Sequence, residues 1–194
     1  MASYYYLASQ LPYLVFGQEP PLSAAAFRRL AENFLKDEDR AQIDRCVLAV
    51  PSEPLSLLPP APGEQKPPSS EFVKGWLEWE RALRLNLARF RAPRLKRESA
   101  ADAPDYPADA VQAAKTASSM DSPLEAEIFL DKARWDAIER LRGLDEVGSN
   151  MVFAYLLKLL LMERRSSFKT EEGFMEYKTL YASIAGSAGP EASK

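Results

Sequence analysis

Apolar residues recur along much of this chain with the spacing of an α-helix. The longest pattern lies within 71–97, where large apolar residues step by three and four positions, at Phe72, Trp76, Trp79, Leu83, Leu87 and Phe90. A single apolar stripe of this kind indicates a helix with one buried face. Pro93 should end or kink this helix, because its ring cannot continue the hydrogen-bond ladder.

Two shorter helical patterns come earlier, at 24–35 and 38–49. Ser23 and Asp37 stand immediately before them, and both are residue types that commonly cap a helix N-terminus. Cys46, the only cysteine, falls on the expected inner face of the second pattern. We interpret it as a small core residue rather than a reactive thiol.

The back half has the clearest helix signals. The sequence Ser-Pro-Leu-Glu at 122–125 is a capping box with proline at the first helical position, and the helix it predicts ends at Gly143. The run at 150–165 has apolar residues around more than half of its circumference, which indicates a helix buried among others. Thr170 begins a third pattern. Short loops favour antiparallel neighbours, so we expect a three-helix bundle over 122–185.

Other segments lack this periodicity. The tyrosine-rich first dozen residues favour a short extended segment or an irregular lead-in, and Pro12 blocks regular continuation. Seven prolines crowd 51–68, which indicates a linker, and one short helix is expected near 108–117. We therefore predict an all-α chain of helical bundles in four parts: an N-terminal helical part at 1–97 that includes the proline-rich linker at 51–70 and the long basic helix, a linker at 98–121, the bundle at 122–185, and a disordered tail at 186–194.

The apolar run at 151–162 does not predict a membrane span. It is about a dozen residues long and contains Lys158, whereas ~20 apolar residues are needed to cross a bilayer. A signal peptide requires a lysine or arginine before its apolar stretch, and none precedes the apolar N-terminal stretch here. A single cysteine excludes a disulfide framework within the chain and favours a reducing compartment. We expect a soluble, cytoplasmic protein.

The composition argues against most catalytic sites. The chain has no histidine, which removes the usual general base near neutral pH and the commonest metal ligand. Its eight glycines form no phosphate-binding loop before a helix. The net charge of −3 gives no sign of a nucleic-acid binder. We therefore predict a non-catalytic protein that uses no cofactor, metal or nucleic acid.

Basic residues are concentrated in one stretch. Between 81 and 97 there are seven of them and no acid: Arg81, Arg84, Arg89, Arg91, Arg94, Lys96 and Arg97. Either they form a solvated face of little energetic weight, or they form a docking face for an acidic partner, since clustered like charge steers association. Lys158, Glu163 and Arg164 in the apolar run also allow two interpretations, ion pairing between helices or contact with a partner. All ten are candidate partner-binding residues.

Three segments together resemble a known family: YYYLASQLP at the N-terminus, SPLEAEIFLDKARWDAIERL at 122–141 and AYLLKLLLMERRSSF at 154–168. The family is an uncharacterised one, encoded in bacterial operons for V-type (A/V-type) ATPases. The middle segment also resembles the C subunit of those ATPases. There a Pro-Leu-Glu start, here Pro123 to Glu125, leads to a helix with an aspartate and an aromatic residue, here Asp131 and Trp135.

The resemblance implies a helical adaptor like the C subunit of a V-type ATPase. That protein sits between the central rotor shaft and the membrane ring of proteolipid subunits, and it passes torque without binding nucleotide or metal. The implied partners are the shaft and the ring, and the implied location is peripheral, at the inner face of the plasma membrane. The stretch at 81–97 would face acidic shaft residues or polar ring loops. Two alternatives stay open: an assembly or accessory factor of the same complex, or an unrelated helical interaction module that binds an acidic partner or an anionic membrane surface.

Overall fold

The computed structural model describes residues 2–49, 69–96 and 103–166. Within those ranges the chain forms seven helices and no strand. The helices are α1 Ala2–Gln10, α2 Ala24–Glu32, α3 Asp37–Ile43, α4 Glu71–Arg91, α5 Ala108–Ser119, α6 Pro123–Arg142 and α7 Ser149–Ser166. The prediction of an all-α class is confirmed for this part of the chain.

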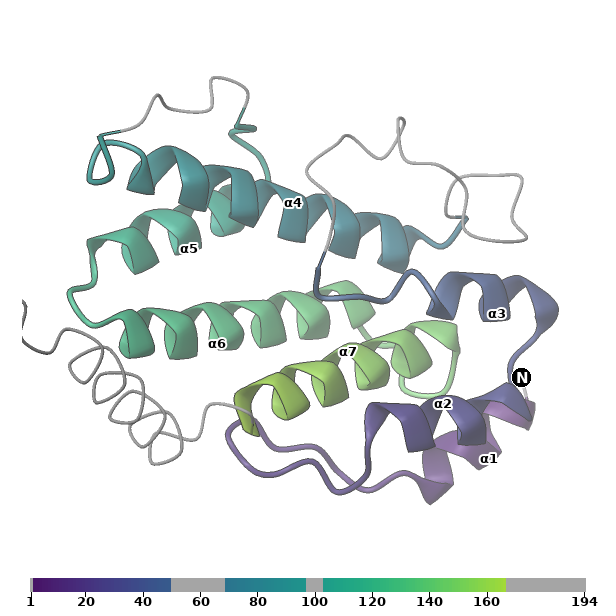
Figure 1. Cartoon of the computed structure of the whole chain (residues 1–194). Coiled ribbons are helices and arrows are strands. Elements are labelled where there is room, and N and C mark those ends of the chain that lie inside the picture. The colour runs from purple at the N-terminus through teal and green to yellow at the C-terminus, as the bar shows by residue number, and fades with distance from the viewer. Residues whose placement is uncertain (1, 50–68, 97–102, 167–194) are drawn as a thin grey trace, which may run out of the picture.

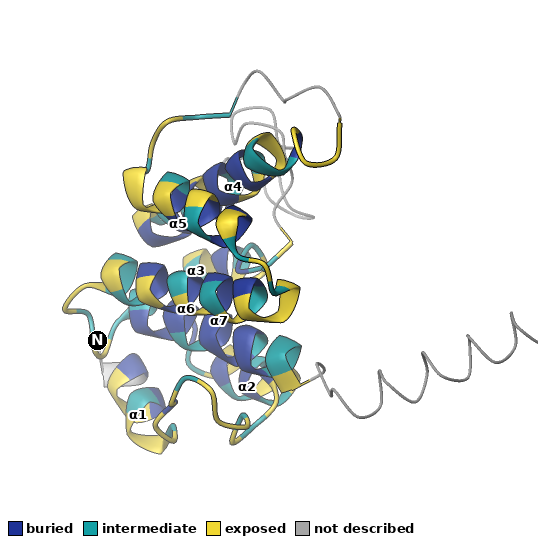
Figure 2. Cartoon of the chain, turned by 90° about the vertical axis from the view of Figure 1, so that its left-hand side faces the viewer, coloured by how far each residue is buried: buried dark blue, intermediate teal, exposed yellow. Residues whose placement is uncertain are grey.

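The helices are arranged in layers (Figure 1). α4 and α5 form one layer and α6 packs against both, while α7 lies on the other side of α6 together with the short helices α1 and α2. One apolar core runs through these layers. Figure 2 shows the buried residues on the facing sides of the helices and the exposed ones on their outer sides.

α4 buries the apolar stripe that the sequence predicted. Its fully covered residues include Phe72, Trp76, Trp79, Leu83 and Leu87. The helix ends two residues before Pro93, as expected from the missing amide of proline. The two tryptophans stack on each other, and their indole N–H groups donate to the Val47 carbonyl at 2.9 Å and to Asp109 at 2.8 Å. The stripe is therefore anchored by hydrogen bonds as well as by burial.

α5 is rich in alanine, and small side chains let it lie close to its neighbours. Its buried residues include Ala110, Ala113, Ala114 and Ala117. It packs mainly on α4 and also on α6. The short helix predicted near 108–117 is present and continues to Ser119. The division of the chain at 98–121 stays a prediction, although α5 shares the apolar core of the helices on either side.

The prediction of an extended N-terminal segment is wrong, because residues 2–10 form the helix α1. Tyr4 and Leu7 lie three positions apart on one helical face, and both are buried in the core. The prediction rested on the strand propensity of tyrosine, a weak preference that packing overrides. The Tyr4 hydroxyl also donates to Asp39 and accepts from the Lys36 amide at 3.3 Å. Burial and the bond to Asp39 raise the pKa of Tyr4 to about 12.

Most helix ends follow the sequence signals. Ser23 and Ser122 cap α2 and α6 by accepting hydrogen bonds from backbone amides three residues later. Gly143 ends α6 with a positive φ of 61°, a conformation that costs glycine little.

α3 departs from its prediction at both ends. Its N-cap is Lys36, so that Asp37 is the first helical residue, where a carboxylate is favoured by the helix dipole. The helix also stops at Ile43, well before the predicted end at 49. Cys46 is fully buried in the turn that follows, which confirms it as a core residue, and burial raises the pKa of its thiol.

Several predicted features lie outside the described residues. They are nearly all of the proline-rich linker at 51–70, the helix from Thr170 that would complete the bundle at 122–185, and the tail at 186–194. Among the helices that are described, none has the length and apolar character needed to span a membrane.

Candidate partner-binding site

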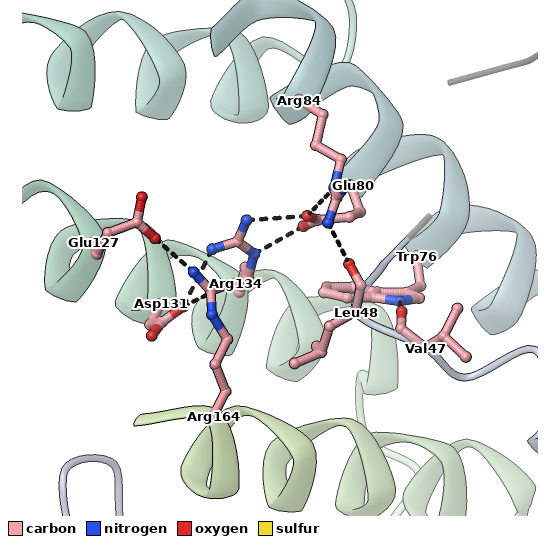
Figure 3. Close-up of polar contacts among 9 residues, drawn as sticks. All are labelled: Val47, Leu48, Trp76, Glu80, Arg84, Glu127, Asp131, Arg134 and Arg164. Carbon is pink, nitrogen blue, oxygen red and sulfur yellow. Dashed lines mark hydrogen bonds and ion pairs between the residues drawn. The ribbon is translucent and has the colours of Figure 1, made fainter. Parts of the chain in front are cut away.

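A buried ion-pair network joins α4, α6 and α7 (Figure 3). At its centre, Arg134 on α6 donates two hydrogen bonds to the Glu80 carboxylate on α4, from Nε at 2.9 Å and from Nη2 at 3.0 Å. The Glu80 side chain is fully buried and that of Arg134 is 5% exposed. Burial alone would lower the pKa of Arg134, but Glu80, together with Asp131 and Glu127, outweighs that effect and raises the pKa. The pair is thus a charge-assisted, bidentate link between two helices.

Asp131 extends the network toward α7. Its Oδ1 accepts from Arg134 at 3.1 Å and lies 3.3 Å from Nη1 of Arg164. Arg164 also donates to Glu127 at 2.6 Å. Burial raises the pKa of Asp131, and the two guanidinium groups oppose that rise without cancelling it. Arg164, a predicted partner-binding residue, therefore connects α7 with α6 inside the chain.

At its other end, the network contacts the segment that follows α3. Arg84 on α4 contacts Glu80 at 3.0 Å through Nε and donates from Nη2 to the Leu48 carbonyl oxygen at 3.0 Å. The buried carboxylate of Glu80 therefore accepts from two guanidinium groups. One continuous set of polar contacts runs from Leu48 through three helices, and it fixes their relative positions.

A second polar cluster surrounds Lys158 on α7. The ammonium pairs with Glu139 on α6 and lies 4.8 Å from the centre of the Trp135 ring. Arg142 contacts the same carboxylate at 3.0 Å. Burial raises the pKa of Glu139, but Lys158 and Arg142 outweigh it, so the pKa lies below its usual value. The cluster borders a pocket of about 280 Å³ whose opposite wall is formed by residues 11–14.

Glu163, the remaining predicted residue of the apolar run, contacts the start of α2. Its carboxylate accepts from the Ala24 amide at 2.7 Å. The positive end of a helix dipole favours a carboxylate at this place. Lys158 and Arg164 form ion pairs between helices, as in the first of the two interpretations given above, whereas Glu163 accepts a hydrogen bond from a backbone amide. Their contact with a partner stays a prediction.

The basic stretch at 81–97 divides into two groups. Arg84 pairs with Glu80, Arg89 lies 3.2 Å from Asp105, and Arg91 lies 4.0 Å from Glu127. Arg81 is half-buried, and Arg97 lies outside the described residues. Arg94 and Lys96 are exposed and form no ion pair with any residue that the structure describes. No acid in the described ranges neutralises their charge.

Arg94, Leu95 and Lys96 form a turn after the end of α4, which we call the basic tip. The Leu95 side chain is 61% exposed, and Lys96 has a positive φ of 51°, which is uncommon for a residue other than glycine. The tip thus presents two cations beside one large apolar side chain. This arrangement suits an acidic surface better than a neutral one, because opposite charge steers association.

Sequence reasoning did not find Glu80, Asp131 and Arg134 as a set. Glu80 and Arg134 are 54 positions apart, so no local spacing connects them. Glutamates stand on both sides of Trp79, and only the fold shows that Glu80 is buried, and therefore needs a cationic partner, while Glu78 is exposed.

The described residues contain no candidate metal site, and comparison with known proteins identifies no relative. The described ranges contain no group of three or more histidine, cysteine, aspartate or glutamate side chains that could hold a metal ion. No protein-family model matches the chain, and no curated protein or solved structure is significantly similar to it.

Proposed function

We propose that this chain is a non-catalytic component of a bacterial V-type ATPase, similar in role to the C subunit, which links the central shaft to the membrane proteolipid ring. The observation that carries the proposal is the buried network of Glu80, Arg134, Asp131 and Arg164. A part that transmits torque has to resist sliding of its helices. Sliding α4 past α6 would leave buried charges unpaired, at a cost of about 3–5 kcal/mol for one broken pair.

The basic tip supports the same proposal from the outside of the molecule. Arg94 and Lys96 provide positive charge at the end of the longest described helix, α4. A helix of this length acts as a stiff support for a contact at its end. In the proposed role, the tip contacts acidic residues of the shaft or the polar loops of the ring, and the chain is peripheral to the inner face of the plasma membrane.

Binding to purified components of the ATPase tests the proposal. The full chain should bind the immobilised shaft, or the detergent-solubilised proteolipid ring, at low ionic strength. It should hydrolyse no ATP on its own. An Arg94→Glu variant should bind more weakly, whereas Arg29→Glu, the same charge change on the exposed face of α2, should bind normally. If the unmodified chain binds neither the shaft nor the ring, the proposal is rejected.

A second candidate function is a helical interaction module for an acidic partner outside any ATPase. The exposure of Leu95 between Arg94 and Lys96 favours it, since this chemistry specifies an acidic surface and not a particular complex. A chain that binds neither shaft nor ring, yet binds acidic protein segments through the basic tip, would have this function.

A further inference from the structure

A groove opens at the end of the molecule that carries the basic tip. There α4 and α5 end and α6 begins, at the left in Figure 1. The groove has a volume of about 330 Å³. Leu95, Met120 and Pro123 contribute apolar surface to it, and Arg91 and Arg94 are its basic residues. Its size lies at the lower end of the range for binding pockets, which fits one or two side chains rather than a large ligand.

The charge around the groove is positive on balance. Glu127 also lines it, but this carboxylate is held by Arg164 at 2.6 Å, so that Arg91, at 4.0 Å, is only loosely engaged. Asp121 is the other acid of the lining. These two carboxylates cannot neutralise all three positive charges, which belong to Arg91, Arg94 and the adjacent Lys96. A ligand with negative charge is therefore favoured.

Ser118 gives a second, independent sign of a ligand. It lines the groove and is 9% exposed, and its hydroxyl has no hydrogen-bond partner among the described residues. Buried hydroxyls are nearly always hydrogen-bonded, so an unpaired one requires an explanation. In the complex we expect this short side chain to rotate so that its hydroxyl reaches an acceptor on the ligand.

Apolar side chains continue outside the groove. Leu95 is 61% exposed, and Leu124 and Ile128, which stand one turn apart on α6, are 49% and 38% exposed. We propose that the groove docks an acidic segment of a partner protein. One large apolar side chain of that segment inserts beside Leu95 and Met120, and its carboxylates lie against Arg91 and Arg94.

The shape of the site favours a protein segment over a membrane. A concave groove selects a protruding side chain, whereas an anionic bilayer is flat and offers none. The inference rests on the proposed function only in that the chain works by contact with a partner. It does not depend on the identity of the complex.

Fluorescence anisotropy with the full chain tests the groove. The probe is a short fluorescein-labelled helical peptide with glutamates around one central phenylalanine. Replacing that phenylalanine by alanine, or the glutamates by glutamine, should weaken binding at least about tenfold, which corresponds to roughly 1.4 kcal/mol. Arg94→Glu should have a similar effect, and Arg29→Glu on α2 should leave the dissociation constant nearly unchanged.

Ser118→Ala separates a ligand-binding hydroxyl from a structural one. Because the hydroxyl has no hydrogen-bond partner among the residues that the structure describes, its removal should not lower the melting temperature. The same variant should bind the peptide several-fold more weakly. A lower melting temperature with unchanged binding would assign Ser118 to the fold and would overturn this part of the proposal.

The remaining outcomes also decide the question. Absence of peptide binding, or binding that Arg94→Glu does not change, would overturn the groove as the docking site. Stronger binding to vesicles containing phosphatidylserine than to the peptide would overturn it in favour of lipid. If Arg94→Glu abolishes peptide binding but not binding to the shaft, the groove stands as a peptide site and is not the shaft contact. If the peptide binds and neither shaft nor ring does, the groove stands and the ATPase role fails.

Discussion

Glu80 and Arg134 are the residues at which a single change should harm the fold most. Glu80→Leu leaves the Arg134 guanidinium without its bidentate partner at a position that is closed from solvent. We expect the free energy of unfolding to fall by about 3–5 kcal/mol. Urea denaturation monitored by tryptophan fluorescence measures the loss.

The double variant Glu80→Leu/Arg134→Leu is the matched control. It removes both charges, so it should recover much of the stability that the single variant loses, since a buried pair replaced by apolar residues is often neutral. Asp131 keeps Arg164 as a partner in that variant. If the double variant is less stable than Glu80→Leu alone, the ion pair is itself a source of net stability, and the expectation that apolar residues can replace it is wrong.

Glu139 should make the stability of the protein depend on pH. Its folded-state pKa lies below the ordinary value of 4.5, because Lys158 and Arg142 outweigh the effect of burial. The unfolded chain therefore takes up a proton at a higher pH than the folded chain does. The contribution of Glu139 to stability is present at neutral pH and is lost as the pH falls below about 4.5 toward the folded pKa.

Thermal melts of Glu139→Gln across this pH range measure the effect. The variant should be less stable than the unmodified chain at pH 7, and the difference should shrink as the pH falls below about 4.5. Glu32→Gln, at an exposed position of α2, should show no such convergence. A gap between Glu139→Gln and the unmodified chain that stays constant with pH would contradict the lowered pKa.

For single residues, the sequence predicts which type of side chain pairs with a buried charge, but not which residue supplies it. Lys158 in an apolar run predicts a carboxylate partner, because an unpaired buried charge is too costly, and Glu139 has this role. Nothing in the spacing distinguishes Glu139 from the other carboxylates on α6. The choice depends on how α6 and α7 cross, which is a property of the packed helices.

At the scale of elements, α7 supplies a large part of the core. Leu156 is fully buried in it, whereas Leu160, one turn later, is only partly buried. Leu156→Ala should therefore lower the free energy of unfolding by about 2–5 kcal/mol by leaving a cavity, and Leu160→Ala should cost clearly less. Chemical denaturation of the two variants side by side gives the comparison. Equal losses would contradict the burial of the helix as described.

The start of α7 depends on a cap supplied by the preceding loop. Asp145 accepts from the Gly148 amide at 2.6 Å and from the Asn150 amide at 3.0 Å. Asp145→Ala removes both bonds and should destabilise the protein by about 0.5–2 kcal/mol. Asp145→Asn keeps a hydrogen-bond acceptor but loses the charge. Its melting temperature should therefore lie between those of Asp145→Ala and the unmodified chain. If Asp145→Ala is as stable as the unmodified chain, Asp145 is not the cap of α7.

The strength of the periodic signal explains which elements the sequence predicts correctly. In α4 six large apolar residues repeat over five turns, and no other structure buries them together. α1 offers only nine residues, and its consecutive tyrosines suit a strand as well as a helix. Its outcome depends on long-range contacts of Tyr4 and Leu7 with the core, which local sequence does not specify. After α3 ends at Ile43, the Val47 and Leu48 carbonyls accept hydrogen bonds from Trp76 and Arg84 on α4, contacts that local sequence does not specify either.

At the scale of the whole molecule, the candidate site could be predicted only in part. The sequence locates a cluster of positive charge at 81–97. It does not show that Arg84 turns toward Glu80 of the same chain, whereas Arg94 and Lys96 have no acidic partner within the described ranges. It also cannot bring Ser118 and Pro123 to the end of α4, because that requires the packing of α5 and α6.

The division between internal and outward-facing charges predicts different responses to salt. Screening shortens the range of exposed charges from about 10 Å at 0.1 M salt to about 3 Å at 1 M, whereas buried pairs are screened much less. The melting temperature should therefore change little over this range, because the pair of Glu80 and Arg134 is closed from solvent. Binding of the shaft, which on our proposal uses Arg94 and Lys96, should weaken strongly over the same range. Arg94→Glu should reduce that salt dependence, since it removes a charge that salt would otherwise screen. Binding as strong at 1 M as at 0.1 M would mean that apolar contacts dominate and that the basic tip does not mediate it.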